Sequence, residues 1–258
     1  ARLSALAALR GGAGLVTLAS PSDALTAHAA AVQAIMVRRC DSIEDWRVLL
    51  ADERRNVLVI GPGLGLQPEE QPAIRAMVSE GVRAGRKLVL DAGALSAFDG
   101  DAGALKACLA ERPLSGADGG RADCVITPHE GEFSRLFREE KDIFASDSKA
   151  ERALAAARFL DCVVLLKGAD TVMASPDGRM WINDNAPPWL GTAGSGDVLA
   201  GLVSAFLAQG VPALEASAMA VYVHGLAGQR GGRYLTADDL PALLQPSLQE
   251  LAAFQPAG

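Results

Sequence analysis

Several features that mark common protein classes are missing from this sequence. No apolar run reaches the ~18 residues that a membrane span requires, so we expect no membrane helix. The four cysteines form no CxxC pair, which argues against a metal or disulfide framework and favours buried thiols in a reducing compartment. The three histidines form no HExxH motif, so a zinc hydrolase is not expected.

Three nucleotide-binding or hydrolase motifs are missing or broken. The pattern GxxxxGK[ST] does not occur, which excludes a P-loop. The stretch GPGLGL at 61–66 begins like a dinucleotide-binding fingerprint, but Leu66 occupies the third glycine position. Ser195 has glycine neighbours without the GxSxG spacing of a hydrolase nucleophile.

Charge and length further limit the functions and the domain organisation that we expect. The 258 residues carry a formal net charge of −7 with scattered basic residues, so we expect no nucleic-acid-binding surface. Half of the chain (50%) is hydrophobic, and its length is enough for one large domain or two small ones. No stretch of the sequence resembles an interdomain linker, which favours one domain. The opening segment, interrupted by Arg10 and glycines, predicts an amphipathic helix rather than a signal peptide. We therefore expect a single cytoplasmic domain over residues 1–258.

Short β-branched runs alternate with alanine- and leucine-rich helical patterns. The runs lack polar alternation, which is typical of parallel strands covered on both faces. An α/β layered fold with a mainly parallel sheet is the prediction. The predicted strands are 15–18, 57–60, 88–91, 124–127 and 162–166, and the predicted helices between them include 69–84 and 148–160.

The pattern changes after residue 171. Residues 171–174 and 180–182 flank a Ser-Pro-Asp-Gly turn, which predicts a hairpin. Helices are expected over 197–209 and 213–228, and a last helix near Thr236 as its N-cap. Residues 111–122, rich in Gly, Pro and charge, are interpreted as a surface connection.

Polar or glycine-rich tips follow four of the predicted strands. Because carboxyl ends of parallel strands gather at the ligand-binding edge of an open sheet, these tips predict a site. They are 61–65, Asp91 to Gly93, Thr127 to Glu132, and Lys167 to Thr171. Structural alternatives stay open for each: a tight turn, a helix cap at Asp91 or Glu132, a loop histidine at His129, and a surface charge at Lys167. His224, on an apolar helix stripe, is interpreted as an interior residue.

The stretch GTAGSGDVLAG at 191–201 joins flexible backbone to a helix. Gly194, Ser195 and Gly196 allow successive amides to face one anion, and Asp197 supplies a base beside it. Phosphoryl transfer needs this combination of positive backbone dipoles and a carboxylate for the attacking hydroxyl. The alternative is that Asp197 merely caps the helix.

These motifs resemble those of a known family. GSGD opening a helix resembles the anion hole of the ribokinase-like superfamily. With GAGLVTLAS (12–20), VIGPGLG (59–65), VLDAGAL (89–95), ITPHEGEF (126–133) and LLKGADT (165–171), the chain resembles the ADP-dependent NAD(P)H-hydrate dehydratase family. The resemblance implies a ribokinase-like three-layer α/β/α sandwich with a mainly parallel central sheet.

The resemblance also implies an activity. Family members repair hydrated NADH or NADPH: ADP, or ATP in some lineages, phosphorylates the ring hydroxyl, and loss of phosphate restores NAD(P)H. Asp197 would be the catalytic base, and Gly194, Ser195 and Gly196 the anion hole. His129, Gly63, Ala1 and Asp197 would bind the hydrated substrate.

Nucleotide, metal and partner roles follow by the same resemblance. Lys167, Gly168, Ala169, Asp170, Thr171 and Gly196 would hold ADP or ATP. Glu132 would help to organise Mg²⁺ indirectly. A homo-oligomer is expected. Some family members are fused to an N-terminal epimerase domain, and such a fusion stays open for the full-length protein.

The sequence departs from the family pattern at three places. The family's first strand would lie upstream of Ala1, so we expect the domain to lack it. Gly93 stands where the family usually has a second aspartate. Ala193 replaces the first glycine of GG[ST]GD, which should be tolerated if its φ is negative.

Two other functions stay open. One is a ribokinase-like kinase acting on a vitamin precursor or sugar alcohol. His129 argues against this alternative, because related kinases more often carry Asn there. The other is a non-catalytic nucleotide-binding module, which retention of Asp197 and Lys167 argues against.

Overall fold

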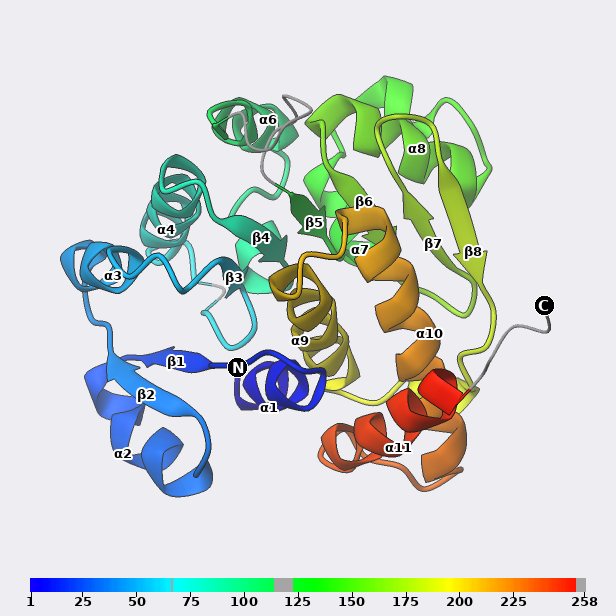
Figure 1. Ribbon diagram of the computed structural model, residues 1–258. Helices are drawn as coiled ribbons and strands as arrows, with labels where there is room; N and C mark the ends of the chain where they lie inside the picture. Colours follow the sequence, from blue (N-terminus) through cyan, green and yellow to red (C-terminus); the bar gives the residue numbers. More distant parts are fainter. Residues whose placement is uncertain (66, 114–122, 254–258) are drawn as a thin grey trace.

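Two β-sheets with helices packed around them form the structure, a computed structural model that describes residues 1–65, 67–113 and 123–253 (Figure 1). The strands are β1 (Thr17–Ser20), β2 (Met36–Arg39), β3 (Val57–Ile60), β4 (Lys87–Leu90), β5 (Cys124–Ile126), β6 (Val163–Leu166), β7 (Thr171–Ala174) and β8 (Met180–Asn183). The α-helices are α1 (Arg2–Arg10), α2 (Ser22–Ala31), α3 (Ile43–Leu50), α4 (Gln71–Arg83), α5 (Gly93–Ser96), α6 (Ala102–Ala110), α7 (Glu130–Leu136), α8 (Lys149–Leu160), α9 (Ser195–Ala208), α10 (Ala213–Gly231) and α11 (Leu240–Ala253). Two 3₁₀ turns, η1 (Lys141–Phe144) and η2 (Pro188–Leu190), join some of them.

The larger sheet is mainly parallel, as predicted. Within the described residues its strand order is β3-β4-β5-β6-β7-β8. Strands β3 to β6 pair in parallel, and β7 and β8 add an antiparallel hairpin at one end. The smaller sheet is the parallel pair β1 and β2. The carboxyl ends of β3 to β6 therefore lie along one edge.

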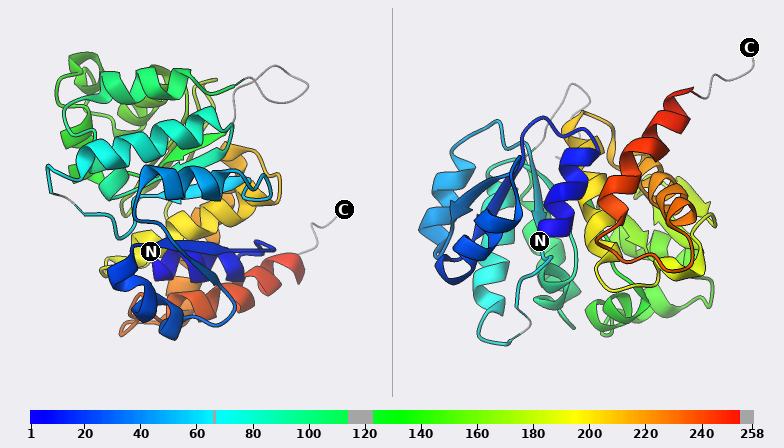
Figure 2. Two further views of the ribbon diagram at one scale, coloured as in Figure 1. Left: turned by 90° about the vertical axis from the view of Figure 1, so that its left-hand side faces the viewer. Right: turned by 90° about the horizontal axis from the view of Figure 1, so that it is seen from below.

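Helices cover both faces of the larger sheet. Leu88 and Leu90 of β4 belong to a core with α3, α4, α6 and α8, whereas Val89 between them belongs to a core with α9, α10 and α11. This alternation follows from the two-residue period of a strand. The layer order helix, sheet, helix can be followed in Figures 1 and 2.

Helix α1 packs against α9 closely enough to require a glycine (Figure 1). A methyl group at Gly201 would lie 2.1 Å from the Ser4 carbonyl oxygen, so only glycine permits this approach. Ala1 lies beside Asp197, and Gly11 lies beside Ala205. The two helices therefore run in the same direction, and their N-terminal ends meet.

Most of the predicted elements are confirmed, including strand 57–60, the hairpin, and the helices that open near Ser148 and Asp197. The Ser148 hydroxyl accepts from the Glu151 N–H, as its capping role requires. Cys124 and Cys162 are buried as expected, but Cys40 and Cys108 are only partly so. The predicted connection over 111–122 lies outside the described residues from 114 onward.

Three predictions about elements were wrong. Strand β2 was missed because its residues are half-buried or exposed and end in two arginines, so no apolar run marks it. The first strand begins at Thr17 rather than at residue 15, in register with β2. Helix α11 begins at Leu240 because the Thr236 N–H and hydroxyl both donate to Asp239, at 2.9 and 2.8 Å, which closes a turn before the helix.

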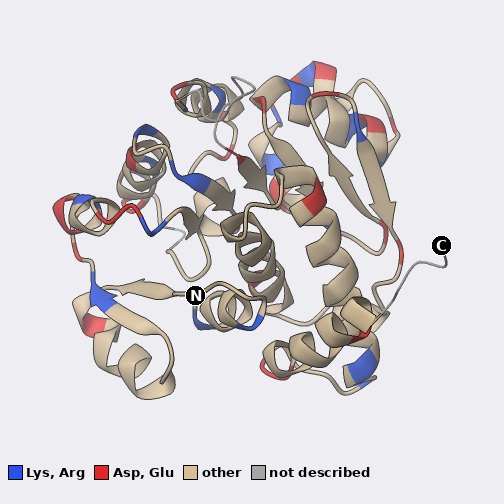
Figure 3. Cartoon of the chain, viewed as in Figure 1, with Lys and Arg blue, Asp and Glu red and all other residues tan. Residues whose placement is uncertain are grey.

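Charged residues of both signs are spread over many elements rather than gathered in one stripe (Figure 3). In the part of the chain that the structure describes, none of the helices combines the length and apolar character that crossing a membrane would need.

Candidate active site

The start of α9 leaves its first backbone amides without a side-chain cap. Gly194 is the N-cap, in the left-handed conformation with φ of 90°, and among the described residues no side chain donates or accepts as a cap there. Asp197 lies in the first turn and, within the described part of the chain, forms no cap hydrogen bond there, so it is not the N-cap of α9. Uncapped amides at a helix start carry partial positive charge and suit an anion.

Ala193 fits its position in this turn. Among the described non-glycine residues, positive φ occurs only at Ala92 and Asp161, so Ala193 does not adopt the left-handed conformation. The replacement of glycine by alanine is therefore tolerated, as predicted. Gly194, one residue further on, is the position that requires glycine.

Two of the residues predicted to bind substrate, Ala1 and Gly63, lie close to Asp197 or to each other. The Ala1 nitrogen lies 3.3 Å from the Asp197 Oδ2 atom. A Cβ atom at Gly63 would lie 3.3 Å from the Ala1 Cβ atom. Gly63 belongs to a tight turn in which the Leu64 N–H donates to the Gly61 carbonyl at 3.0 Å. The structural alternative for 61–65, a tight turn, is therefore confirmed.

Lys167 links this group to the neighbouring strand ends. Its Nζ atom lies 2.7 Å from Asp91 Oδ1 and 3.7 Å from Glu132 Oε2. A Cβ atom at Gly196 would lie 3.3 Å from the same Nζ atom. The Lys167 side chain is 18% exposed, so it is not the surface charge that one interpretation suggested. The ammonium group therefore lies between two acidic residues and the start of α9.

His129 and Glu132 form a reciprocal cap at the start of α7. His129 Nδ1 accepts from the N–H groups of Gly131 (3.0 Å) and Glu132 (3.3 Å), while the Glu132 carboxylate accepts from the His129 N–H at 2.8 Å. This arrangement confirms a structural role for both residues. The His129 side chain is still 54% exposed, and its backbone pairs with Lys167 as an isolated parallel bridge.

The turn after Lys167 is ordered by its own side chains. The Thr171 hydroxyl donates to the Gly168 carbonyl at 3.0 Å. Lys149 donates to the Asp170 carboxylate at 2.9 Å, and this hydrogen bond lowers the pKa of Asp170. Ala169, between Gly168 and Asp170, is exposed. The turn thus presents backbone to solvent beside two lysines.

Sequence reasoning placed Asp91 at a strand tip of the predicted ligand-binding edge but gave it no role in the site. Its carboxylate is buried and accepts from Thr127 Oγ1 at 2.8 Å and from Lys167. Helix α5 has Ala92 as its N-cap without a side-chain cap bond, so the alternative that Asp91 caps a helix is wrong. Both Asp91 and Lys167 directly follow predicted parallel strands, and this shared position could have indicated that they lie close together. Lys149 was also missed, and no motif marks it.

His224 lies behind the helix start, in the interior as predicted. Its Nε2 atom is 3.2 Å from the Ser195 hydroxyl oxygen, and the residue is buried. Burial lowers the pKa of His224 to about 4. The imidazole is therefore neutral at pH 7.

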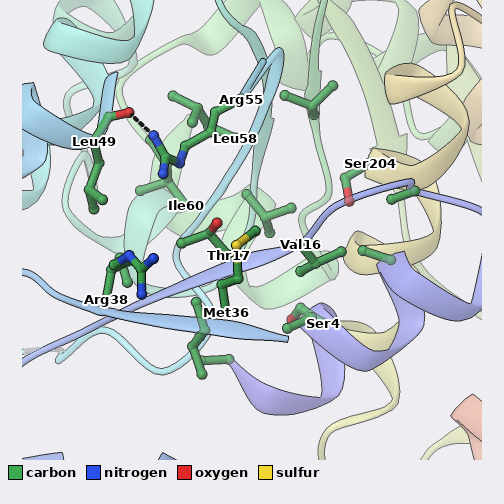
Figure 4. A pocket seen from close by; sticks show the side chains of 18 of the residues that line it. Ser4, Val16, Thr17, Met36, Arg38, Leu49, Arg55, Leu58, Ile60 and Ser204 are labelled. Atoms are coloured by element: carbon green, nitrogen blue, oxygen red, sulfur yellow. Dashed lines mark hydrogen bonds between the residues drawn. The ribbon is translucent and has the colours of Figure 1, made fainter. Parts of the chain in front are cut away.

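A cavity with a volume of about 350 Å³ has Ala1, the neighbour of Asp197, in its lining; part of this lining is drawn in Figure 4. Val16 and Thr17 line one side and Leu58 and Ile60 of β3 the other, so the cavity lies between β1 and β3. Arg55 donates to the Leu49 carbonyl at 2.8 Å on its wall. Ala1 also lines the cavity, and because Gly63 lies beside Ala1, the cavity adjoins the Gly63 turn. A further strand upstream of Ala1 stays a prediction.

Fold and site together define the class of protein. A ribokinase-like superfamily protein from Enterococcus faecalis has the same fold: the TM-score is 0.74 and the identity 25%, over 96% of this chain and 81% of that one. With helices on both faces of a mainly parallel sheet and an uncapped helix start at its carboxyl edge, this is a ribokinase-like α/β/α protein.

Sequence comparison identifies the family. The model described as NAD(P)H-hydrate dehydratase matches residues 1–249, and the chain belongs to this family. The bifunctional NAD(P)H-hydrate repair enzyme Nnr of Moorella thermoacetica is 36% identical over 264 residues, which cover 96% of this chain and 46% of that protein. The ADP-dependent (S)-NAD(P)H-hydrate dehydratase of Xanthomonas campestris is 35% identical over 235 residues, 88% of this chain and 74% of that one. The chain therefore spans about half the length of the Moorella relative.

Proposed function

We propose that this chain dehydrates hydrated NADH or NADPH with ADP as phosphoryl donor and so restores the reduced cofactor. Family membership supports the reaction, and the Xanthomonas relative carries ADP dependence in its name. The observation that carries the proposal for this chain is the meeting of Asp197, the uncapped start of α9 and Lys167 in one place.

Asp197 accepts the proton of the substrate hydroxyl as that oxygen attacks the terminal phosphorus of ADP. The bond from phosphorus to the bridging oxygen breaks, and AMP leaves. The phosphate on the ring then departs with the carbon–oxygen bonding pair. Loss of a proton from the adjacent ring carbon restores the double bond. The carboxylate of Asp197 is 28% exposed, which leaves it open to a ligand.

The helix start and Lys167 stabilise the charge that moves in this step. The amides of Gly194, Ser195 and Gly196 face the transferring phosphoryl group, and the Lys167 ammonium lies beside Gly196. The turn from Gly168 to Thr171 holds the rest of the nucleotide. Gly63, Ala1 and His129 contact the hydrated dinucleotide.

The carboxylates of the site fit Mg²⁺ that arrives with the nucleotide. Among residues 1–65, 67–113 and 123–253, no group of three or more His, Cys, Asp or Glu side chains could enclose a metal ion. Glu132 accepts from the His129 N–H and lies 3.7 Å from Lys167, so its role toward the ion is indirect. Mg²⁺ is commonly bound through substrate phosphates and one or two carboxylates. When bound, it would neutralise phosphate charge.

Incubation of the chain with hydrated NADH and ADP tests the proposal. The absorbance of the reduced nicotinamide should recover with time, and should not recover when ADP is left out. A stable phosphorylated product without reduced cofactor would instead identify the kinase alternative. ATP in place of ADP determines the preferred donor.

Self-association is a further part of the proposal. Four large apolar side chains are exposed on the neighbouring elements β8 and α10: Trp181, Ile182, Met219 and Tyr222 are 41%, 60%, 43% and 42% exposed. Trp181 lies opposite Met173, on the face of the sheet that α10 covers, so a second copy docked there would cover Trp181, Met219 and Tyr222. Light scattering should give a mass above that of one chain, and Trp181→Lys should lower it. A cytoplasmic location and fusion to an epimerase domain stay predictions.

A further inference from the structure

The turn that opens α9 receives a side-chain hydrogen bond from a different helix. Ser195 Oγ lies 3.2 Å from His224 Nε2, within hydrogen-bond distance. His224 belongs to α10, which packs along α9. The Ser195 side chain thus links the first turn of α9 to α10.

His224 can make this bond without adding charge to the site. The pKa of His224 is lowered to about 4: desolvation by burial is the main cause, a backbone hydrogen bond with Ser195 partly opposes it, and the nearby Lys167 ammonium adds to the lowering. A neutral imidazole has one nitrogen that donates and one that accepts, so it serves a hydroxyl in either direction. Lys167 therefore stays the cation next to Gly196.

We propose that His224 is a positioning residue for the anion site, acting through Ser195 to hold the amides of Gly194 to Gly196 in the geometry that phosphoryl transfer requires. The inference rests on the proposed function. Gly194 adopts a left-handed conformation, and glycine is the most permissive residue in the chain, so this turn gains little rigidity from its own backbone. Donors that stabilise a transition state act best when they are already oriented.

Four variants test the role: His224→Leu, His224→Gln, Ser195→Ala, and His224→Leu combined with Ser195→Ala. Loss of one hydrogen bond should lower kcat roughly tenfold, which corresponds to about 1.4 kcal/mol, while KM changes less than about threefold. The double variant should be no slower than either single variant, because all three lack the same bond. His224→Gln should recover part of the rate, since its amide can reach the hydroxyl.

A matched variant separates positioning from packing. Val223, the neighbouring buried residue on α10, has no hydrogen bond to Ser195, so Val223→Ala should lower the unfolding temperature and leave kcat unchanged. Losses that add in the double variant would overturn the proposal. Equal kcat in His224→Leu and Val223→Ala would overturn it too.

A readout without turnover distinguishes this inference from the proposed function. In ¹⁵N-labelled protein, the amide signals of Gly196 and Asp197 should shift when inorganic phosphate is added to the parent chain. In His224→Leu these shifts should be smaller, and amide exchange in the first turn of α9 faster. If the parent chain fails to dehydrate hydrated NADH, the proposed function fails while this comparison still applies. Identical shifts and exchange rates in both proteins would overturn the inference.

Discussion

Two lysine–aspartate pairs lie at opposite edges of the same parallel sheet. At the carboxyl ends, Lys167 and Asp91 are 2.7 Å apart, with side chains 18% and 2% exposed. At the amino ends, Lys87 and Asp123 are 3.0 Å apart, with side chains 28% and 30% exposed. The distances are similar, but only Lys167 lies beside an uncapped helix start and a second carboxylate. Burial and neighbours, rather than the ion pair itself, distinguish the candidate site.

The largest expected difference between the two ends is in kcat, when an aspartate at each end is changed to asparagine. Asp197→Asn should lower kcat roughly 100- to 10,000-fold, because the amide cannot accept the hydroxyl proton. ADP affinity should stay within about threefold, since the base acts mainly in the transition state. Asp123→Asn, the same change at the amino ends, should leave kcat at the parental value. Steady-state rates and calorimetric ADP titrations check both, and a near-parental rate for Asp197→Asn would break the comparison.

Removing each lysine should affect nucleotide binding very differently. Lys167→Met should weaken ADP binding roughly 10- to 100-fold, because a charged hydrogen bond to phosphate contributes about 1.5–3 kcal/mol. Lys87→Met should not change ADP affinity. Calorimetry on both variants measures the contrast, and equal affinities would show that Lys167 does not contact the nucleotide.

The two lysines should also differ in how much each contributes to the unfolding free energy. Lys167→Met leaves the Asp91 carboxylate buried without its cation, which typically costs about 3 kcal/mol or more of unfolding free energy. Lys87→Met should lower the unfolding free energy by about 1 kcal/mol or less, because the side chains of both Lys87 and Asp123 are partly exposed. Adding Asp91→Asn to Lys167→Met should recover much of the loss. Urea unfolding measures these values, and a double variant as unstable as Lys167→Met would count against the buried pair.

The smallest expected effect is a pH dependence. The unfolded chain binds a proton at His224 near pH 6.5, whereas in the folded chain burial lowers this pKa to about 4. The unfolding free energy should therefore fall as pH drops, by about 2 kcal/mol from this group between pH 7.5 and pH 5. Between pH 7.5 and pH 5, the unfolding free energy of His224→Gln should fall by about 2 kcal/mol less than that of the parent chain. Urea unfolding at the two pH values tests it; equal losses in both proteins would contradict a buried neutral His224.

The sequence indicates where the site lies better than it indicates how the site is connected. Glycine-rich and polar tips after apolar runs predict a ligand-binding edge, because parallel strands gather their carboxyl ends. The Asp91–Lys167 pair joins residues 76 positions apart and depends on the pairing of β4, β5 and β6. Motif spacing along the chain carries no information about such a contact.

Local patterns also failed where surroundings decided the outcome. Strand β2 is held by pairing with β1, and its arginines hide it from an apolar-run search. The hydrogen bond between His224 and Ser195 depends on how α10 packs on α9, which the apolar stripe alone does not specify. The stripe did predict correctly that His224 is buried.

Product stoichiometry tests the central claim most directly. The parent chain should be given hydrated NADH and ADP, and AMP, inorganic phosphate and reduced nicotinamide should be quantified in the same samples. Phosphorylation at the ring hydroxyl followed by phosphate loss predicts that the three products appear in equal amounts. A phosphorylated dinucleotide that persists, or reduced nicotinamide formed without AMP, would contradict the account.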